Sequence, residues 1–275
     1  MRRAVMLASS HGSSLEVLHV LGEQSLEALR RWIPDPLGVG ERLVGAVREE
    51  LERSAGEAAK GSGVRIDTRV VLGDVVETIL EHAVGADLLV VGAHGTNPLK
   101  TLMLGTTAER LAGRCATPML VVRVSPERAY SKVLVAVDLL PGSEETMAAA
   151  LGFAGAATLT AVHAYDVPFE SMLGRAGVDR ALIEDHRKNA RREALEKIAE
   201  LSRSVSGDAK RFGAVAERGH PPATLVKQQR EMGADLVVIR KRSRSLAEAL
   251  ILGSVTRHVL TEATCDVLLI AEPRR

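Results

Sequence analysis

Aromatic residues are scarce in this chain of 275 residues, and its charges nearly cancel. Phe, Trp and Tyr together make up 2% of the sequence, which leaves few of the aromatic surfaces on which single-stranded nucleic acids stack. The net charge is +1, so no strong electrostatic field steers the protein toward DNA, RNA or an anionic lipid surface. We therefore expect no nucleic-acid partner.

Cysteines are few, and long apolar runs are absent from the sequence. The two cysteines, Cys115 and Cys265, stand in no metal-binding or redox spacing, which favours a reducing compartment over a disulfide scaffold. No apolar stretch approaches the roughly 18 residues that indicate a membrane span, and the one near the start is too short for a signal peptide. We expect a cytoplasmic protein without a membrane partner.

What is present is typical of an aliphatic α/β protein with two domains. Hydrophobic residues make up 46% and charged residues 26%, as in ordinary globular chains. The length suits two domains of about 130 to 140 residues.

The sequence repeats itself, with five matched segments in the same order in both halves. The pairs are Leu15–Val20 with Leu159–Ala164, Val70–Asp74 with Ala216–His220, Gly85–Gly92 with Gly233–Arg240, Leu104–Thr107 with Leu252–Val255, and Thr117–Val122 with Cys265–Ile270. The repeat predicts a tandem duplication, with one domain at 1–125, a linker at 126–131 and a second domain at 132–275.

Short apolar runs alternate with longer amphipathic ones in each half. In the second half we expect strands at Lys132–Val137, Leu159–Ala164, Lys210–Ala216, Leu236–Ile239 and Val267–Ile270, with helices between them. Continuous apolar runs indicate strands that are covered on both faces. The pattern predicts two tandem, doubly wound parallel sheets, which bind ligands beyond the carboxyl ends of their strands.

The start of the first half permits two interpretations. Aligned without gaps from His19 and His163, Arg3–Ser14 matches the end of the first helix of the second half, and the opening strand is missing. In the alternative, Arg3–Ala8 is a remodelled strand. The short link to Leu15 would then require it to lie antiparallel.

A glycine-rich stretch follows the strand that we expect to end at Gly92. It reads GAHGTNPLKTLMLGT and places Gly95, Gly105 and Thr106 at fixed spacings, with His94 inside the loop. Glycines allow positive φ and close backbone approach to a phosphate, and a helix starting near Thr106 adds its positive end. The alternative is that these glycines only turn the chain between a strand and a helix.

The corresponding stretch of the second half keeps only its last glycine. Arg240 and Ser243 replace the first two glycines, whereas Gly253 and Ser254 remain. Four cations in five residues, Arg240, Lys241, Arg242 and Arg244, form either an anion site or a solvated basic loop.

Asp138 ends the expected opening strand of the second half. It has no neighbouring His, Ser or second acid in a catalytic pattern, so it either binds a ligand or caps the following turn. We expect His19 and His163 to be structural, and the other histidines form no constellation. The sequence predicts no catalytic residue and no dedicated metal site.

These residues resemble the universal stress protein family over nearly the whole chain. Its nucleotide-binding members have a strand that ends in Asp and a G-x2-G-x9-G-[S/T] loop. Here KVLVAVD, Lys132–Asp138, resembles that strand, and Gly92, Gly95, Gly105 and Thr106 match the loop. The resemblance implies an adenine nucleotide α-hydrolase-like fold, with Asp138 near the adenosine and the loop around the phosphates and ribose. It also implies an intramolecular pseudo-dimer through Met119–Val122 and Val267–Ile270.

The leading hypothesis is a stress-responsive regulatory protein that binds ATP or AMP, with Mg²⁺ shared with the phosphates. Its expected binding residues are Gly92, His94, Gly95, Gly105, Thr106, Asp138, Arg240, Arg242, Gly253 and Ser254. The glycine loop and Asp138 lie in different halves, so a degenerate protein-interaction scaffold without nucleotide is the alternative. An unknown protein partner and a homodimer of whole chains are further expectations. A slow ATPase ranks third because the sequence supplies no general base.

Overall fold

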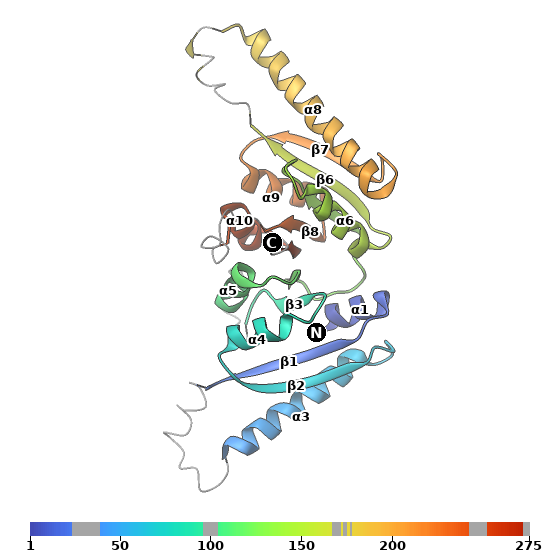
Figure 1. The fold of residues 1–275 in the computed structure, drawn as a ribbon, viewed down its shortest axis with the longest axis vertical. Helices are drawn as coiled ribbons and strands as arrows, with labels where there is room; N and C mark the ends of the chain where they lie inside the picture. The colour runs from blue at the N-terminus through green and yellow to red at the C-terminus, as the bar shows by residue number, and fades with distance from the viewer. Residues whose placement is uncertain are drawn as a thin grey trace. The chain divides into compact units, whose positions relative to one another are not determined.

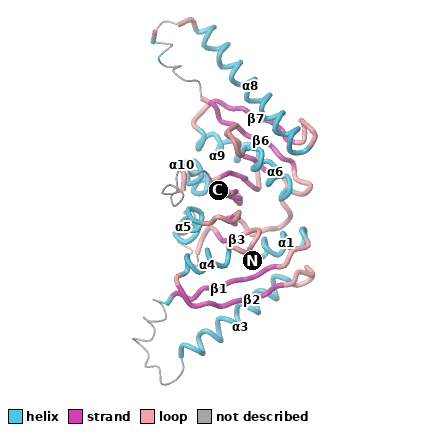
Figure 2. Tube along the Cα trace, viewed as in Figure 1, coloured by secondary structure: helices cyan, strands magenta, loops and turns pink. Residues whose placement is uncertain are grey.

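A computed structural model describes residues 1–23, 39–95, 104–166, 172, 175–176, 178–241 and 252–271. The first repeat contains α1 (Arg2–His11), β1 (Leu15–Gly22), α3 (Val39–Ala59), β2 (Ile66–Gly73), α4 (Val75–Ala83), β3 (Leu89–Gly92), α5 (Thr106–Arg114) and β4 (Met119–Val122) (Figure 1). The second contains β5 (Lys132–Ala136), α6 (Ser143–Ala154), β6 (Thr158–Tyr165), α8 (Arg180–Ser206), β7 (Phe212–Arg218), α9 (Pro221–Met232), β8 (Leu236–Arg240), α10 (Ser254–Glu262) and β9 (Asp266–Ile270). Strands and helices alternate in both repeats, as the apolar runs predicted (Figure 2).

The second repeat forms a parallel, doubly wound sheet. Its strands lie in the order β9-β8-β5-β6-β7, so β5 is central and pairs with both β6 and β8. Val133, Leu134 and Val135 of β5 are completely buried, as expected for a strand with helices on both faces. The crossover from β5 to β6 and the later return to β8 on its other side create the strand-order reversal at which ligands bind.

The last strands of the two repeats pair with each other. β4 and β9 are antiparallel, with Met119 opposite Leu269 and Val121 opposite Val267. These strands are buried, and their pairing extends the second-repeat sheet to the order β3-β4-β9-β8-β5-β6-β7. The expected intramolecular pairing is therefore present.

The beginning of the chain is helical. Arg2–His11 forms α1, which buries Val5 and Ala8 and ends at Gly12, where φ is 62° and the backbone N–H donates to Ala8 O. The interpretation of Arg3–Ala8 as a strand was wrong. Because α1 occupies the place of the end of α6, the described residues of the first repeat contain no counterpart of β5.

Without that central strand, β1 and β2 form a separate two-stranded parallel sheet. The chain correspondingly divides into two compact units. Met1–Val90 with Ser125–Ala129 make up the first unit, and Val91–Val124 with Tyr130–Arg275 make up the second. Most of the glycine loop region, α5 and β4 thus belong to the same unit as the second repeat.

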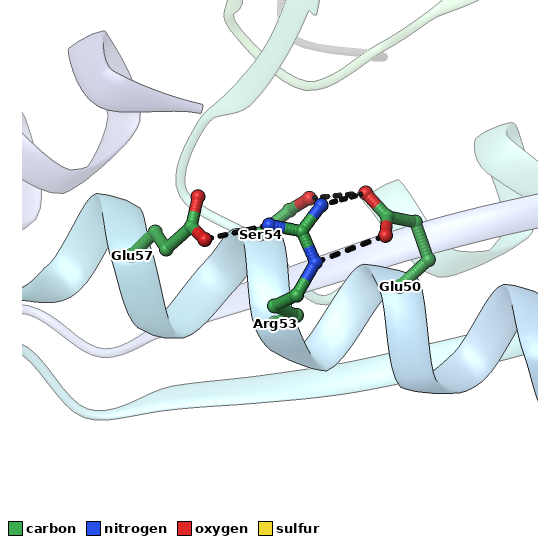
Figure 3. A network of polar contacts seen from close by, with 4 residues as sticks. All are labelled: Glu50, Arg53, Ser54 and Glu57. Atoms are coloured by element: carbon green, nitrogen blue, oxygen red, sulfur yellow. Dashed lines mark hydrogen bonds and ion pairs between the residues drawn. The ribbon is translucent and has the colours of Figure 1, made fainter.

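The long helix α3 carries a charged cluster on its exposed side (Figure 3). Arg53 bonds both oxygens of Glu50 and also pairs with Glu57 at 2.6 Å, while Ser54 donates to Glu50. The hydrogen bonds from Arg53 and Ser54 lower the pKa of the Glu50 carboxyl. This spacing of three and four residues is that of a solvated helix surface, where such pairs contribute little to stability.

Among the helices that the structure describes, none is both long and apolar enough to cross a membrane.

Candidate nucleotide site

A cavity of about 640 Å³ opens in the second unit, at the carboxyl ends of the second-repeat strands. Its wall includes Ala136, Ala164 and Ile239 from the strands, Pro221 and Leu225 from α9, and Gly253 to Thr256 from the start of α10. The lining is mostly apolar with a few polar groups, as in small-molecule sites. Sequence analysis missed this apolar wall, because strand-end alanines and a helix leucine form no motif.

Asp138 stands at the rim of this cavity and organises the turn that follows β5. Its Oδ1 accepts hydrogen bonds from Leu140 N and from Ser143 Oγ, both at 3.1 Å. Leu139 has a φ of 58° and Gly142 a φ of 96°, and the turn closes with Ser143 N donating to Leu140 O. Asp138 therefore caps the turn, as one of the two interpretations predicted, and it also lines the cavity.

Arg240, at the end of β8, lies against that turn and lines the cavity beside it. Its guanidinium packs directly over Gly142, where a Cβ would lie 1.0 Å from Nη1. Nη1 also lies 3.6 Å from Glu145 Oε2, and the side chain is only 13% exposed. The cation that replaces a loop glycine thus lines the cavity beside the turn of Asp138.

Lys241 does not join Arg240 in a cluster of cations. It is 8% exposed, and its Nζ donates to Gly113 O at 2.5 Å and to Cys115 O at 3.4 Å. An ammonium group at the end of α5 satisfies carbonyls that the helix leaves open. The hypothesis that Lys241 holds an anion or belongs to a solvated loop was wrong, and Arg242, Ser243 and Arg244 lie outside the described residues.

The first turn of α10 completes the cavity wall. Gly253 is the N-cap residue, and it has no side chain with which to cap the helix. Gly253 and Ser254 line the cavity, so the N–H groups of this turn, which a helix leaves open, lie at the cavity wall. A helix N-terminus in this place favours an anionic group.

The glycine loop of the first repeat brings its two ends together within the second unit. Ala93 N donates to Val122 O and Gly105 N to Ala93 O, both at 2.8 Å, and α5 begins at Thr106. A Cβ on Gly105 would lie 3.3 Å from Ala93 O, whereas Gly95 has open space. Neither Gly95 nor Gly105 has a positive φ. Glycine is therefore favoured at position 105 because the backbone of Ala93 lies close to it. Positive φ, which sequence analysis offered as a second reason, does not apply to these two glycines.

The two aligned histidines differ in their surroundings. His163 Nδ1 lies 2.9 Å from Val137 O, which fits the structural role that was expected for it. His19 is exposed on β1, and the described residues of the first repeat contain no counterpart of Val137.

In the part of the chain that the structure describes, no group of three His, Cys, Asp or Glu residues is placed to hold a metal ion. The polar groups that line the cavity include Asp138, Arg240 and the first turn of α10.

Comparison with known proteins shows the family to which the chain belongs. The model of the universal stress protein family matches residues 1–123 and 129–271. The chain belongs to this family. A universal stress protein of Mycolicibacterium smegmatis is 26% identical over 284 residues, which cover 98% of this chain and 91% of that protein.

Other universal stress proteins match the single repeat and the tandem fold. The protein YxiE of Bacillus subtilis is 30% identical over 129 residues, covering 44% of this chain and 86% of its own length. A crystal structure of a universal stress protein from Archaeoglobus fulgidus superposes with a TM-score of 0.70 and covers 98% of this chain and 93% of that one. Its sequence identity is 14%, so this likeness concerns the fold alone. Two universal stress repeats in one α/β chain are thus shown.

Proposed function

We propose that this universal stress protein is a regulatory protein that binds an adenine nucleotide in the cavity of its second repeat. The main observation in its support is that apolar strand ends, the turn of Asp138 and the first turn of α10 all line one cavity. Sequence analysis favoured the glycine loop of the first repeat, and the described geometry favours the second repeat.

The base and ribose fit the inner part of the cavity. Its volume of about 640 Å³ lies within the range of about 300 to 1,000 Å³ that is usual for small-molecule sites. Ala136, Ala164 and Leu225 supply apolar surface for a flat base. Asp138 and Thr146 supply oxygen atoms beside them for the polar edges of the ligand.

The phosphate end is proposed to lie against Arg240 and α10. A helix N-terminus attracts phosphate through its open N–H groups and dipole. A guanidinium adds charge-assisted hydrogen bonds that can replace the lost glycine amides. Binding exchanges the weak contact of Arg240 with Glu145, 3.6 Å apart, for contacts with phosphate oxygens.

The second candidate function is that of a scaffold without nucleotide. Its supporting observation is that Asp138 is already bonded to Leu140 N and Ser143 Oγ, and Arg240 already packs over Gly142. In this hypothesis the turn and the guanidinium close the site instead of serving a ligand. We rank an ATPase third, because the proposed roles of Asp138 and Arg240 are in binding.

Calorimetric titration with ATP, AMP and adenosine separates the two candidates. The expected variant effect is that Arg240→Met weakens ATP binding at least tenfold, the size of a charge-assisted hydrogen bond, and leaves adenosine binding unchanged. Arg192→Met removes an exposed arginine of α8 and serves as the matched control. No heat with any ligand, or tighter ATP binding by Arg240→Met, would support the closed scaffold instead.

A further inference from the structure

Lys241 directly follows Arg240, and the two side chains point to opposite faces of the sheet. The backbone of Lys241 continues the ladder, because its N–H donates to Ile270 O of β9 at 2.9 Å. Successive side chains of a strand alternate between the two faces. Arg240 accordingly contacts the turn before α6, where Nη1 donates to Pro141 O at 3.5 Å, whereas Lys241 contacts α5. Fixing one of these side chains therefore constrains the other.

The contact of Lys241 with α5 is buried. Its Nζ donates to Gly113 O at 2.5 Å and to Cys115 O at 3.4 Å, and the residue is 8% exposed. Gly113 and Cys115 stand at the end of α5, where carbonyls lack partners within the helix and favour a cation. A lysine side chain is flexible in solvent, so enclosing it and bonding its ammonium group fastens the end of β8 to α5.

The first repeat makes the same backbone bond without this side chain. Ala93 is aligned with Lys241, and its N–H donates to Val122 O at 2.8 Å, the carbonyl that is aligned with Ile270 O. The residue before Ala93 is Gly92, where the second repeat has Arg240. The second repeat thus has a cation at the cavity and a cation at α5 where the first repeat has a Gly-Ala pair.

α5 also contacts the other wall of the phosphate end, within the same compact unit. Arg257 Nε of α10 lies 3.2 Å from Glu109 Oε1, in the first turn of α5, and Arg257 directly follows Thr256, which lines the cavity. These two side chains are 55% and 41% exposed, so the pair contributes little to stability. The buried bonds of Lys241 are therefore the stronger of these two links between α5 and the cavity.

We propose that Lys241 is a positioning residue for the phosphate end of the ligand, so that α5 of the first repeat supports the binding site of the second. This inference rests on the proposed function. By fastening the end of β8, Lys241 holds the Arg240 guanidinium over Gly142, in the cavity that the first turn of α10 also lines. A guanidinium that is already held in place loses less freedom when it binds phosphate. The first repeat thereby contributes to nucleotide binding through α5.

Calorimetric titration of Lys241→Met with AMP and adenosine tests the proposal on the full chain. Methionine keeps an apolar stem and removes the ammonium group. AMP should bind about fivefold more weakly or worse, whereas adenosine, which lacks the phosphate, should bind within about twofold of the parent. Lys241→Gln keeps a hydrogen-bond donor and should give a smaller loss with the same selectivity, which tests the proposal even if Lys241→Met does not fold. Lys210→Met removes an exposed lysine before β7 and should bind both ligands like the parent.

A double variant and amide hydrogen exchange separate positioning from general destabilisation. Once Arg240→Met has removed the guanidinium, Lys241→Met should cause no further loss of AMP affinity, because the two residues act through one contact. In the ligand-free protein, Lys241→Met should also speed amide exchange at position 241, where the bond to Ile270 O is no longer held by α5.

The outcomes distinguish this inference from the function on which it rests. If the parent binds AMP, four results would each overturn the positioning role alone: undiminished AMP affinity of Lys241→Met, equal losses for AMP and adenosine, additive losses in the double variant, or unchanged exchange at position 241. If the parent binds no AMP, the proposed function is overturned, and the role of Lys241 at the phosphate is overturned with it.

Discussion

The hydroxyl of Tyr130 donates a hydrogen bond to Asp266 Oδ2 at 2.7 Å, and both side chains are buried. Asp266 Oδ1 also accepts from the backbone amides of Arg123 at 2.8 Å and Val124 at 3.2 Å. A carboxylate at the start of β9 therefore fixes both ends of the connection between the two repeats. The sequence aligns Asp266 with Pro118, which cannot make these bonds, so this contact exists once in the duplicated chain.

Asp266→Ala should destabilise the protein by about 3 kcal/mol, because it leaves a buried hydroxyl and two partly buried amides without their acceptor. Tyr130→Phe removes one of the three donors and should cost about 1 kcal/mol. Urea denaturation of the two variants and the parent measures both values. Equal stability of Asp266→Ala and Tyr130→Phe would contradict the role of the carboxylate in holding the amides.

Two glycines, Gly142 beside the cavity and Gly152 within α6, should respond to alanine in opposite directions. Gly142 has a φ of 96° and lies under the Arg240 guanidinium, so Gly142→Ala should destabilise by about 1 to 2 kcal/mol and displace that side chain. Gly152 lies in α6 with open space around it, so Gly152→Ala should stabilise by about 0.5 to 1 kcal/mol. Thermal denaturation gives the two signs, and ATP titration of Gly142→Ala should show weaker binding. If both variants shift the melting temperature in the same direction, the account of Gly142 is wrong.

Cys265 should make stability fall at alkaline pH. Burial raises the pKa of its thiol to about 12, against about 8.5 in an unfolded chain. A raised pKa contributes stability that is fully present below about pH 8.5 and is lost as the pH rises toward 12. Between these values the parent should lose up to about 1.4 kcal/mol per pH unit more than Cys265→Ala does.

Urea titrations of both proteins from pH 8 upward measure this difference. Because the thiolate is the reactive form, Cys265 should also resist alkylation at pH 8 until the protein unfolds. Rapid labelling of native Cys265, or parallel pH profiles of parent and variant, would contradict the effect of burial.

The fold of the second repeat was largely predictable from its sequence. Continuous apolar runs such as Val133–Val135 indicated strands covered on both faces, and the repeat supplied their order along the chain. The start of the first repeat was not decided by pattern, because MRRAVMLASS is apolar enough for either a strand or a helix. The gapless alignment predicted the structure correctly: Arg3–Ser14 aligns with the end of α6, and α1 lies at the same distance before β1 as α6 lies before β6.

The candidate site was predicted less completely. The motif residues Asp138, Arg240, Gly253 and Ser254 do lie around one cavity. The role of Lys241 was not predictable, because its partner, Gly113 O, is 128 residues away in sequence. The apolar wall was missed for a similar reason: Ala164 and Leu225 acquire their meaning only when β6 and α9 come together. Local spacing identified the glycine loop, and tertiary packing decided where the cavity forms.

The central claim is that an adenine nucleotide occupies the second-repeat cavity, and parallel AMP titrations of two variants test it most directly. Ala164→Phe fills the apolar wall, whereas Gly105→Val blocks the glycine loop of the first repeat near Ala93 O. The account predicts that the parent and Gly105→Val bind AMP with similar affinity and that Ala164→Phe loses binding. Loss of binding in Gly105→Val with full binding by Ala164→Phe would place the nucleotide at the glycine loop and contradict the account.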